Sequence, residues 1–215
     1  AARRGLLLLS DEIYDDIRYD DAPFTPLAAL TGDLPCLTFA GLSKVHRACG
    51  FRIGWATLSG SDERIAEYRD ALQLLAALRL CANVPAQWAI APALNGPDTI
   101  FALTAPGGRL HESRRAVLEG VARSRFLECV APEGALYAFP SVRADVFPDF
   151  DDNAFALRLL DEEHALVVPG SSFNLQASRH FRITLLPEPA EIADVFARIE
   201  RVLARISEAR EARVA

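Results

Sequence analysis

The chain contains a single lysine, Lys44, among its 23 basic residues, and arginine occupies the other 22 positions. A lysine amine can lose its proton and attack a carbonyl carbon, which an arginine guanidinium cannot do. Two interpretations are open from composition alone. Lys44 is a nucleophilic amine, or it is a chance survivor in a chain that otherwise uses arginine.

Three further polar residues are placed where they could act together with Lys44. Asp11 and Tyr14 follow the first predicted strand, Lys44 follows the second, and Arg52 lies at the start of the third. Ends of strands are where open α/β sheets bind ligands. Each residue also has a structural interpretation, because Asp11 could cap a loop, Tyr14 could be core, and Arg52 could form a surface ion pair. The order and spacing of all four favour a shared site.

The hydrophobic pattern predicts the elements that must position these residues. Short apolar runs predict strands, and apolar residues at three- and four-residue steps predict helices. The expected strands are residues 5–9, 34–40, 51–58, a pair at 126–130 and 135–139, and then 166–168 and 181–185. The expected helices are residues 61–78, 85–95, 109–124, 153–163 and 192–206. The first strand is a continuous apolar run, as is typical of a strand buried on both faces of a parallel sheet.

Two parts follow from this arrangement. Residues 1–105 alternate strands and helices and predict an α/β part with a mainly parallel sheet. Residues 106–215 predict an α+β part that ends in the clearest amphipathic helix of the chain. We expect the first part to carry the lysine site.

Composition excludes several classes of function. The net charge of −6 argues against a nucleic-acid backbone or an anionic membrane as the partner. No apolar run approaches the ~20 residues of a membrane-spanning helix. The four cysteines are widely spaced, without a zinc or disulfide pattern, so we expect no metal and a reducing cytoplasm. Methionine is absent even at position 1, and we therefore expect the chain to begin inside a longer protein.

Several short segments together resemble the pyridoxal-phosphate-dependent class I/II aminotransferases of fold type I. These segments, in chain order, are residues 10–14 (SDEIY), 41–44 (GLSK), 50–55 (GFRIGW), 132–137 (PEGALY), 168–173 (VPGSSF) and 180–183 (HFRI). The resemblance covers essentially the whole chain and corresponds to the second half of such an enzyme. Residues 41–44, 79–87 and 106–110 are most similar to the alanine (glutamate–pyruvate) aminotransferases of bacteria. The implied fold is the C-terminal part of the large domain, followed by the α+β small domain.

The resemblance implies a role for each residue that could contact pyridoxal 5′-phosphate. Lys44 would bind the cofactor covalently and, once released, would carry the substrate α-proton. Asp11 would keep the pyridine nitrogen protonated, and Tyr14 would hydrogen-bond the ring 3′-oxygen. Arg52 would bind the phosphate, with Ser43 as a second contact.

The resemblance also implies a substrate contact and one departure from the family. Arg182 would bind the substrate α-carboxylate through two parallel hydrogen bonds. Gly41 stands where many relatives carry a serine that contacts the phosphate, so that contact is lost or is taken by a backbone N–H. Much of the cofactor cradle would lie upstream of this chain. We therefore expect the isolated 215 residues to bind the cofactor weakly or not at all, and the intact enzyme to be a homodimer.

The expected reaction is transfer of an amino group between alanine and 2-oxoglutarate. Three alternatives stay open. A carbon–sulfur β-lyase or another class I aminotransferase would keep the cofactor and change the chemistry. An aminotransferase-like effector domain of a transcription regulator would change the class of function. An inactive fragment would have no function of its own.

Overall fold

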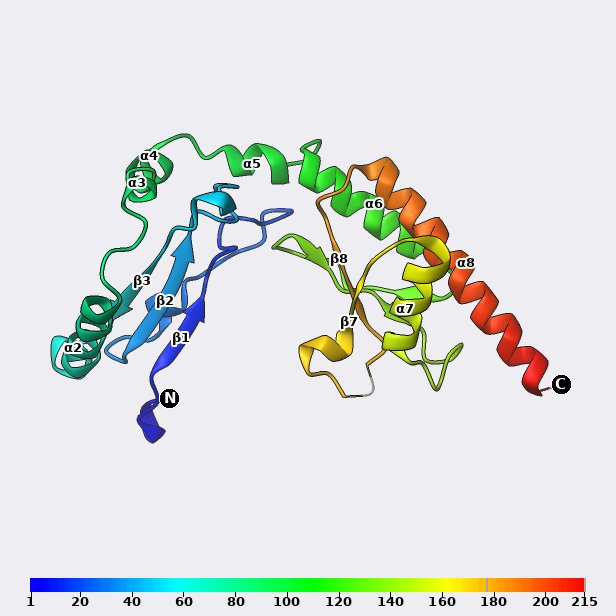
Figure 1. Cartoon of the computed structure of the whole chain (residues 1–215), viewed down its shortest axis with the longest axis horizontal. Helices are drawn as coiled ribbons and strands as arrows, with labels where there is room; N and C mark the ends of the chain where they lie inside the picture. Colours follow the sequence, from blue (N-terminus) through cyan, green and yellow to red (C-terminus); the bar gives the residue numbers. More distant parts are fainter. Residues whose placement is uncertain (177, 215) are drawn as a thin grey trace. The chain divides into compact units, whose positions relative to one another are not determined.

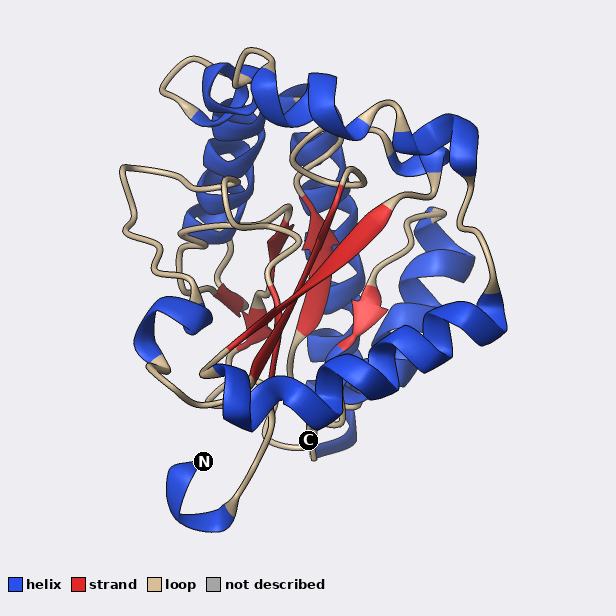
Figure 2. Ribbon diagram, turned by 90° about the vertical axis from the view of Figure 1, so that its left-hand side faces the viewer, coloured by secondary structure: helices blue, strands red, loops and turns tan. Residues whose placement is uncertain are grey.

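The computed structural model describes residues 1–176 and 178–214, and it forms two compact units, Ala1–Ala102 and Leu103–Ala215 (Figure 1). The units divide three residues before the boundary that we placed after residue 105. Strands are short, and most described residues lie in helices and loops (Figure 2). Within the described ranges, no helix combines the length and apolar character needed to cross a membrane.

The first unit combines three strands with several helices. Its elements are η1 (Ala2–Arg4), β1 (Leu8–Asp11), α1 (Leu27–Leu30), β2 (Cys36–Gly41), η2 (Cys49–Phe51), β3 (Gly54–Ser59), α2 (Asp62–Arg79), α3 (Val84–Gln87), α4 (Ile90–Asn95) and the start of α5 (Thr99–Thr104). The elements named η are 3₁₀ helices.

The three strands form one sheet in the order β1-β2-β3 (Figure 1). β1 runs parallel to β2, with Asp11 opposite Phe39, and β3 runs antiparallel to β2, with Gly41 opposite Gly54. The expectation of a first strand buried on both faces is wrong for this chain, because Leu9 is 62% exposed. β1 lies at the edge of the described sheet, where alternate side chains are left uncovered.

The helices of this unit agree with the sequence pattern in part. α2 begins after Ser61, as predicted, although the Ser61 side chain makes no capping hydrogen bond. The single helix expected over residues 85–95 is divided into α3 and α4. Pro92 explains the break, because it has no N–H to donate to the carbonyl of Trp88 and its ring would clash with that carbonyl.

The second unit is built around long helices. Its elements after α5 are α6 (Arg109–Arg123), β4 (Leu127–Glu128), β5 (Tyr137–Ala138), β6 (Ser141–Val142), α7 (Asp152–Glu163), β7 (Val168–Pro169), η3 (Gly170–Phe173), β8 (Phe181–Thr184) and α8 (Pro189–Val214). α6 lies along α8, and α7 also packs against α8 (Figure 1). The apolar stripe predicted for the last helix forms this contact, since Ile192, Phe196 and Ile199 are buried.

The strand pair expected between residues 126–130 and 135–139 does not form. β4 pairs with β6, whereas β5 pairs with β8, some forty residues further along the chain. β8 is the middle strand of a three-stranded sheet in the order β5-β8-β7, and both of its pairings are antiparallel. This sheet is the scaffold for Arg182, which lies on β8.

Candidate functional site

The strand directions bring four of the candidate residues to one edge of the first sheet. Because β1 and β2 are parallel, their carboxyl ends meet at the same edge, and the antiparallel β3 begins there. Asp11 is the last residue of β1, and Tyr14 follows in the next turn. Lys44 lies three residues beyond the end of β2, and Arg52 lies two residues before β3.

The turn that carries Asp11 and Tyr14 is held by a network of hydrogen bonds. The backbone N–H of Glu12 donates to the carbonyl of Phe39 at 2.9 Å, which extends the β1–β2 pairing by one step. The N–H of Ile13 donates to Asp11 Oδ1 at 3.3 Å. Glu12 Oε1 accepts from the N–H of Leu27 at 2.8 Å. The chain after β1 is therefore anchored at the sheet edge.

The loop that carries Lys44 is closed by backbone hydrogen bonds at both ends. The N–H of Leu42 donates to the carbonyl of Ile53 at 3.1 Å, and the N–H of Ala48 donates to the carbonyl of Leu42 at 2.9 Å. Lys44 is half-buried, and its Nζ lies 5.8 Å from the centroid of the Tyr14 ring. The amine and the phenol ring, which come from two different strand ends, are thus neighbours in space.

A small apolar cluster includes residues at both ends of this loop. Leu42 and Ile53, on either side of the lysine loop, are buried together with Ala86 of α3. Trp55 of β3 and Ile90 of α4 pack against the same cluster. The helices α3 and α4 therefore help to position the lysine loop, which is a structural role that the sequence pattern did not assign to this segment.

Ser43 and Arg52 differ in their exposure and in their local contacts. Ser43 is half-buried next to Lys44. Arg52 is exposed, has a φ of 56°, and donates from Nη1 to the carbonyl of Cys49 at 2.9 Å, so it closes the turn η2. A non-glycine residue with a positive φ is uncommon. Arg52 thus has a local structural contact and a solvent-facing guanidinium at the same sheet edge.

Gly41 is a glycine because its backbone lies against the neighbouring strand. A Cβ at this position would lie 2.8 Å from the carbonyl oxygen of Ile53 and 3.0 Å from Cα of Gly54. A serine side chain cannot be placed there without moving β3. The strand pairing of this chain therefore leaves no room for the serine that the resemblance would place at this position.

The chemical types at this edge fit pyridoxal phosphate. A carboxylate matches a protonated ring nitrogen, a phenol matches the ring oxygen, an amine matches the aldehyde, and a guanidinium with a hydroxyl matches the phosphate. The described residues include no group of three or more His, Cys, Asp or Glu side chains that could hold a metal ion. These side-chain types are compatible with an organic phosphate cofactor that carries a carbonyl.

Arg182, in the second unit, has a different environment. Its guanidinium carbon lies 4.4 Å from the centroid of the Tyr137 ring and 5.0 Å from that of Phe173. Its Nε is buried and has no hydrogen-bond partner among the described residues. A buried donor without a partner is costly, and a ligand that supplied an acceptor would remove that cost.

The strand register explains one of these ring contacts. Tyr137 lies opposite Thr184 in the β5–β8 pair, so Arg182 is its diagonal neighbour on the same face of the sheet. The sequence pattern assigned neither Tyr137 nor Phe173 to a site around Arg182. The signal that identifies both is their contact with Arg182, which depends on strand partners far apart in the sequence.

Comparison with known proteins agrees with this arrangement. The model of the family "Aminotransferase class I and II" matches residues 1–199. The chain is 43% identical over 203 residues to the glutamate–pyruvate aminotransferase AlaA of Escherichia coli K12, covering 94% of this chain and 50% of that protein. It is also 43% identical to the alanine aminotransferase of Mycobacterium tuberculosis H37Rv, covering 94% of this chain and 47% of that protein. The chain spans about half the length of the curated relatives it matches.

Solved structures give the same result. An aminotransferase from Escherichia coli superposes with a TM-score of 0.90 at 43% identity, covering 95% of this chain and 50% of that one. The alanine aminotransferase of Pyrococcus furiosus superposes with a TM-score of 0.86 at 32% identity, covering 95% and 51%. The family model extends over residues 1–199, these relatives each match 94–95% of the chain, and the chain therefore belongs to the class I and II aminotransferases.

Proposed function

We propose that this chain is the lysine-bearing part of a pyridoxal-phosphate-dependent aminotransferase that exchanges an amino group between alanine and 2-oxoglutarate. The printed names of its relatives, alanine aminotransferase and glutamate–pyruvate aminotransferase, support this choice of substrates. The observation that carries the proposal is the only lysine of the chain, whose amine lies 5.8 Å from the Tyr14 ring at the same sheet edge as Asp11 and Arg52.

In this proposal the first unit holds the cofactor. Arg52 and Ser43 would hold the phosphate, Asp11 would hold a proton at the ring nitrogen, and Tyr14 would donate to the ring oxygen. When bound, pyridoxal phosphate supplies a ring that delocalises negative charge from the substrate α-carbon. Lys44 would bind the aldehyde carbon and, when released, would move the proton at the substrate α-carbon as a general base.

Arg182 would bind the substrate in the same proposal. Its planar guanidinium can donate two parallel hydrogen bonds to an α-carboxylate, which fixes the orientation of the α-carbon. The unpaired, buried Nε supports this role because it offers a donor that the described residues leave unused. All α-amino acids and 2-oxo acids carry this carboxylate, so Arg182 would serve both half-reactions.

The test is reductive trapping of the lysine in the protein expressed from its native reading frame. We expect borohydride reduction in the presence of pyridoxal phosphate to attach a phosphopyridoxyl group, with loss of one water from the cofactor and gain of two hydrogens, to the peptide that contains Lys44. Lys44→Ala should abolish both the label and the transamination of alanine with 2-oxoglutarate. Lys44→Arg keeps the positive charge but cannot form the bond, so it should fail equally.

A control variant and a product analysis distinguish this proposal from the alternatives. Arg69→Ala, which removes an exposed side chain on α2, should leave label and turnover unchanged. Turnover retained in Lys44→Ala would refute the proposal. Release of a thiol and pyruvate from cystathionine, without transamination, would indicate a β-lyase instead.

We also infer that the intact enzyme is a cytoplasmic homodimer. Leu74, Leu75 and Leu78 of α2 are each more than 60% exposed, and Trp88, which follows α3, is 80% exposed. These uncovered apolar side chains of the first unit support an interface. Cys49 and Cys81 are free and exposed, which supports a reducing compartment. Sedimentation of the intact protein would test the dimer, and a monomer at micromolar concentration would contradict it.

A further inference from the structure

The guanidinium of Arg182 depends on the turn η3 for one of its two ring contacts. Phe173 is the last residue of η3, and its ring centroid lies 5.0 Å from the guanidinium carbon. The ring also meets Phe139 edge-on, with centroids 5.6 Å apart. The position of Phe173 is therefore set by where η3 lies relative to the β5-β8-β7 sheet.

A buried carboxylate holds the beginning of η3. Asp152, in the first turn of α7, is only 5% exposed, and its Oδ2 accepts from the backbone N–H of Ser171 at 2.7 Å. The neighbouring Asn153 donates from Nδ2 to Asp152 Oδ1 at 3.2 Å and to Ser171 Oγ at 2.8 Å. A charge-assisted hydrogen bond of this kind is strong, and burying a carboxylate without one would be costly.

Gly170 fixes the other side of the same turn. Its N–H donates to the carbonyl of His180 at 2.8 Å. A Cβ at this position would lie 2.1 Å from Ser178 Oγ and 2.9 Å from the His180 carbonyl oxygen. The turn η3 therefore packs closely against the residues just before β8, the strand that carries Arg182, and is hydrogen-bonded to Asp152.

We propose that Asp152 is a positioning residue, which holds Phe173 over the Arg182 guanidinium and thereby orients Arg182 toward the substrate carboxylate. The inference rests on the proposed function, because the carboxylate is the ligand assigned there to Arg182. A ring over the planar face of a guanidinium leaves its N–H edge available to a carboxylate. Asp152 touches neither substrate nor cofactor in this proposal, and it acts only through the Ser171 N–H and the turn that follows.

The first measurement records the NMR signal of the Arg182 Nε–H group and does not depend on catalytic turnover. The protein is expressed from its native reading frame with ¹⁵N-arginine, and the Arg182 signal is identified by its loss in Arg182→Lys. We expect Phe173→Leu to shift this signal, because the ring current of Phe173 is removed. Asp152→Ala should shift it in the same direction, whereas Asp152→Asn, which keeps an oxygen acceptor for the Ser171 N–H, should leave it near the wild-type position.

The second measurement compares KM with kcat. Asp152→Ala and Phe173→Leu should raise KM for the amino acid about three- to tenfold, the range expected for one cation–π contact. kcat should change less, and Asp152→Asn should restore KM. Asp151→Ala is the matched control, because Asp151 caps the same helix through the N–H of Ala154 at 2.9 Å and does not bond to η3.

The outcomes separate this inference from the proposed function. An unchanged Arg182 signal in Asp152→Ala, or an equal shift in Asp151→Ala, would overturn the positioning role. If the wild-type protein shows no transamination, the proposed function fails. The positioning role stands in that case if the Arg182 signal shifts in Asp152→Ala and stays near the wild-type position in Asp152→Asn. A protein that transaminates with the same KM in Asp152→Ala keeps its function and overturns the inference.

Discussion

Gly41 and Gly54 face each other across the β2–β3 pair, immediately before the loop that carries Lys44. The two backbones are so close that a Cβ on Gly41 would lie 2.8 Å from the Ile53 carbonyl oxygen. That carbonyl accepts the hydrogen bond from Leu42 that closes the lysine loop. A side chain at position 41 therefore acts on the loop through the strand pairing.

Gly41→Ser should destabilise the protein rather than add a phosphate contact. Forcing extra atoms into a packed position costs about 1–3 kcal/mol, and here the clash is with backbone. We expect a lower thermal midpoint and weaker binding of pyridoxal phosphate, measured by calorimetry and by titration of the cofactor absorbance. Ala56→Ser, on an exposed position of β3, is the control and should change neither. Tighter cofactor binding in Gly41→Ser would contradict the expectation.

The elements that the sequence predicted well are those whose signals are local. Four helices each begin after a helix-breaking residue or carry an acidic residue in the first turn, namely α2, α6, α7 and α8. Their apolar residues recur at helical spacing. The positions of Asp11 and Lys44 near strand ends were also predictable, because the first apolar run stops at Ser10 and the second at Gly41. Local pattern was therefore enough to predict which residues lie at the sheet edge.

The features that the sequence did not predict depend on partners that are distant in the chain. β5 was expected to pair with its neighbour, but it pairs with β8, and this pairing puts Tyr137 next to Arg182. The contact of Asp152 with Ser171 joins a helix to a turn in the same way. Two-residue strands carry too little alternation to specify a partner. The environment of Arg182 could not be derived from spacing for this reason.

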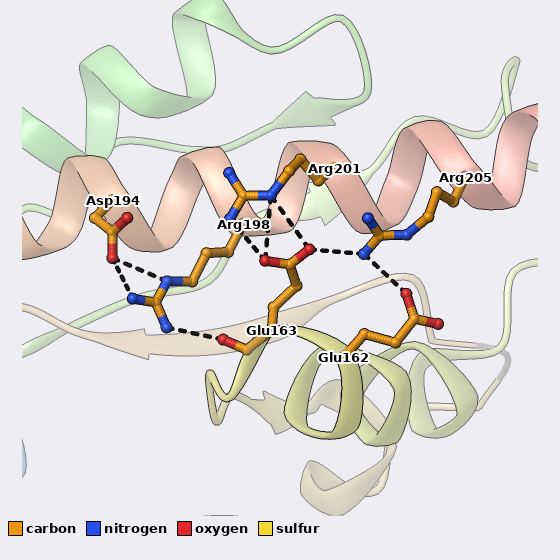
Figure 3. Close-up of polar contacts among 6 residues, drawn as sticks. All are labelled: Glu162, Glu163, Asp194, Arg198, Arg201 and Arg205. Carbon is orange, nitrogen blue, oxygen red and sulfur yellow. Dashed lines mark hydrogen bonds and ion pairs between the residues drawn. The ribbon is translucent and has the colours of Figure 1, made fainter.

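Glu163 should make the stability of the second unit depend on pH in the acidic range. Arg201 and Arg205 of α8 bind its carboxylate at 2.6 and 2.7 Å, and its side chain is only 12% exposed (Figure 3). These hydrogen bonds, with Arg201 contributing most, lower the pKa of Glu163 from 4.5 to about 2. Because the pKa is lower in the folded state, the contribution to stability is complete above pH 4.5 and is lost as the pH falls toward 2.

Glu163→Gln tests this dependence. The variant should have a lower thermal midpoint than the wild type at pH 6, and the difference should shrink between pH 4.5 and pH 2. Asp161→Asn, an exposed substitution on the same helix, is the control. A difference that stays constant down to pH 2 would mean that the carboxylate does not link α7 to α8 through its charge.

Gly120 of α6 should tolerate no side chain while Phe196 of α8 is present. A Cβ at position 120 would lie 2.4 Å from Cγ of Phe196, which is itself buried. Gly120→Ala should lower the free energy of unfolding by about 1–2 kcal/mol, although alanine is the better helix former by up to about 1 kcal/mol. The double variant with Phe196→Leu should lose less stability than the two single variants added together. Strict additivity in chemical denaturation would contradict the close packing of these helices.

Arg182→Lys should separate substrate binding from cofactor attachment. Lysine keeps the positive charge but loses the planar pair of donors that a carboxylate accepts, and it also loses the guanidinium face that meets Tyr137 and Phe173. Loss of charge-assisted hydrogen bonds worth about 1.5–3 kcal/mol corresponds to a decrease in kcat/KM of about 10- to 150-fold. Reductive trapping at Lys44 should continue at the wild-type level, because that residue belongs to the other unit. Loss of trapping in Arg182→Lys would mean that Arg182 is needed for the cofactor site. An unchanged kcat/KM would mean that the carboxylate role is wrong.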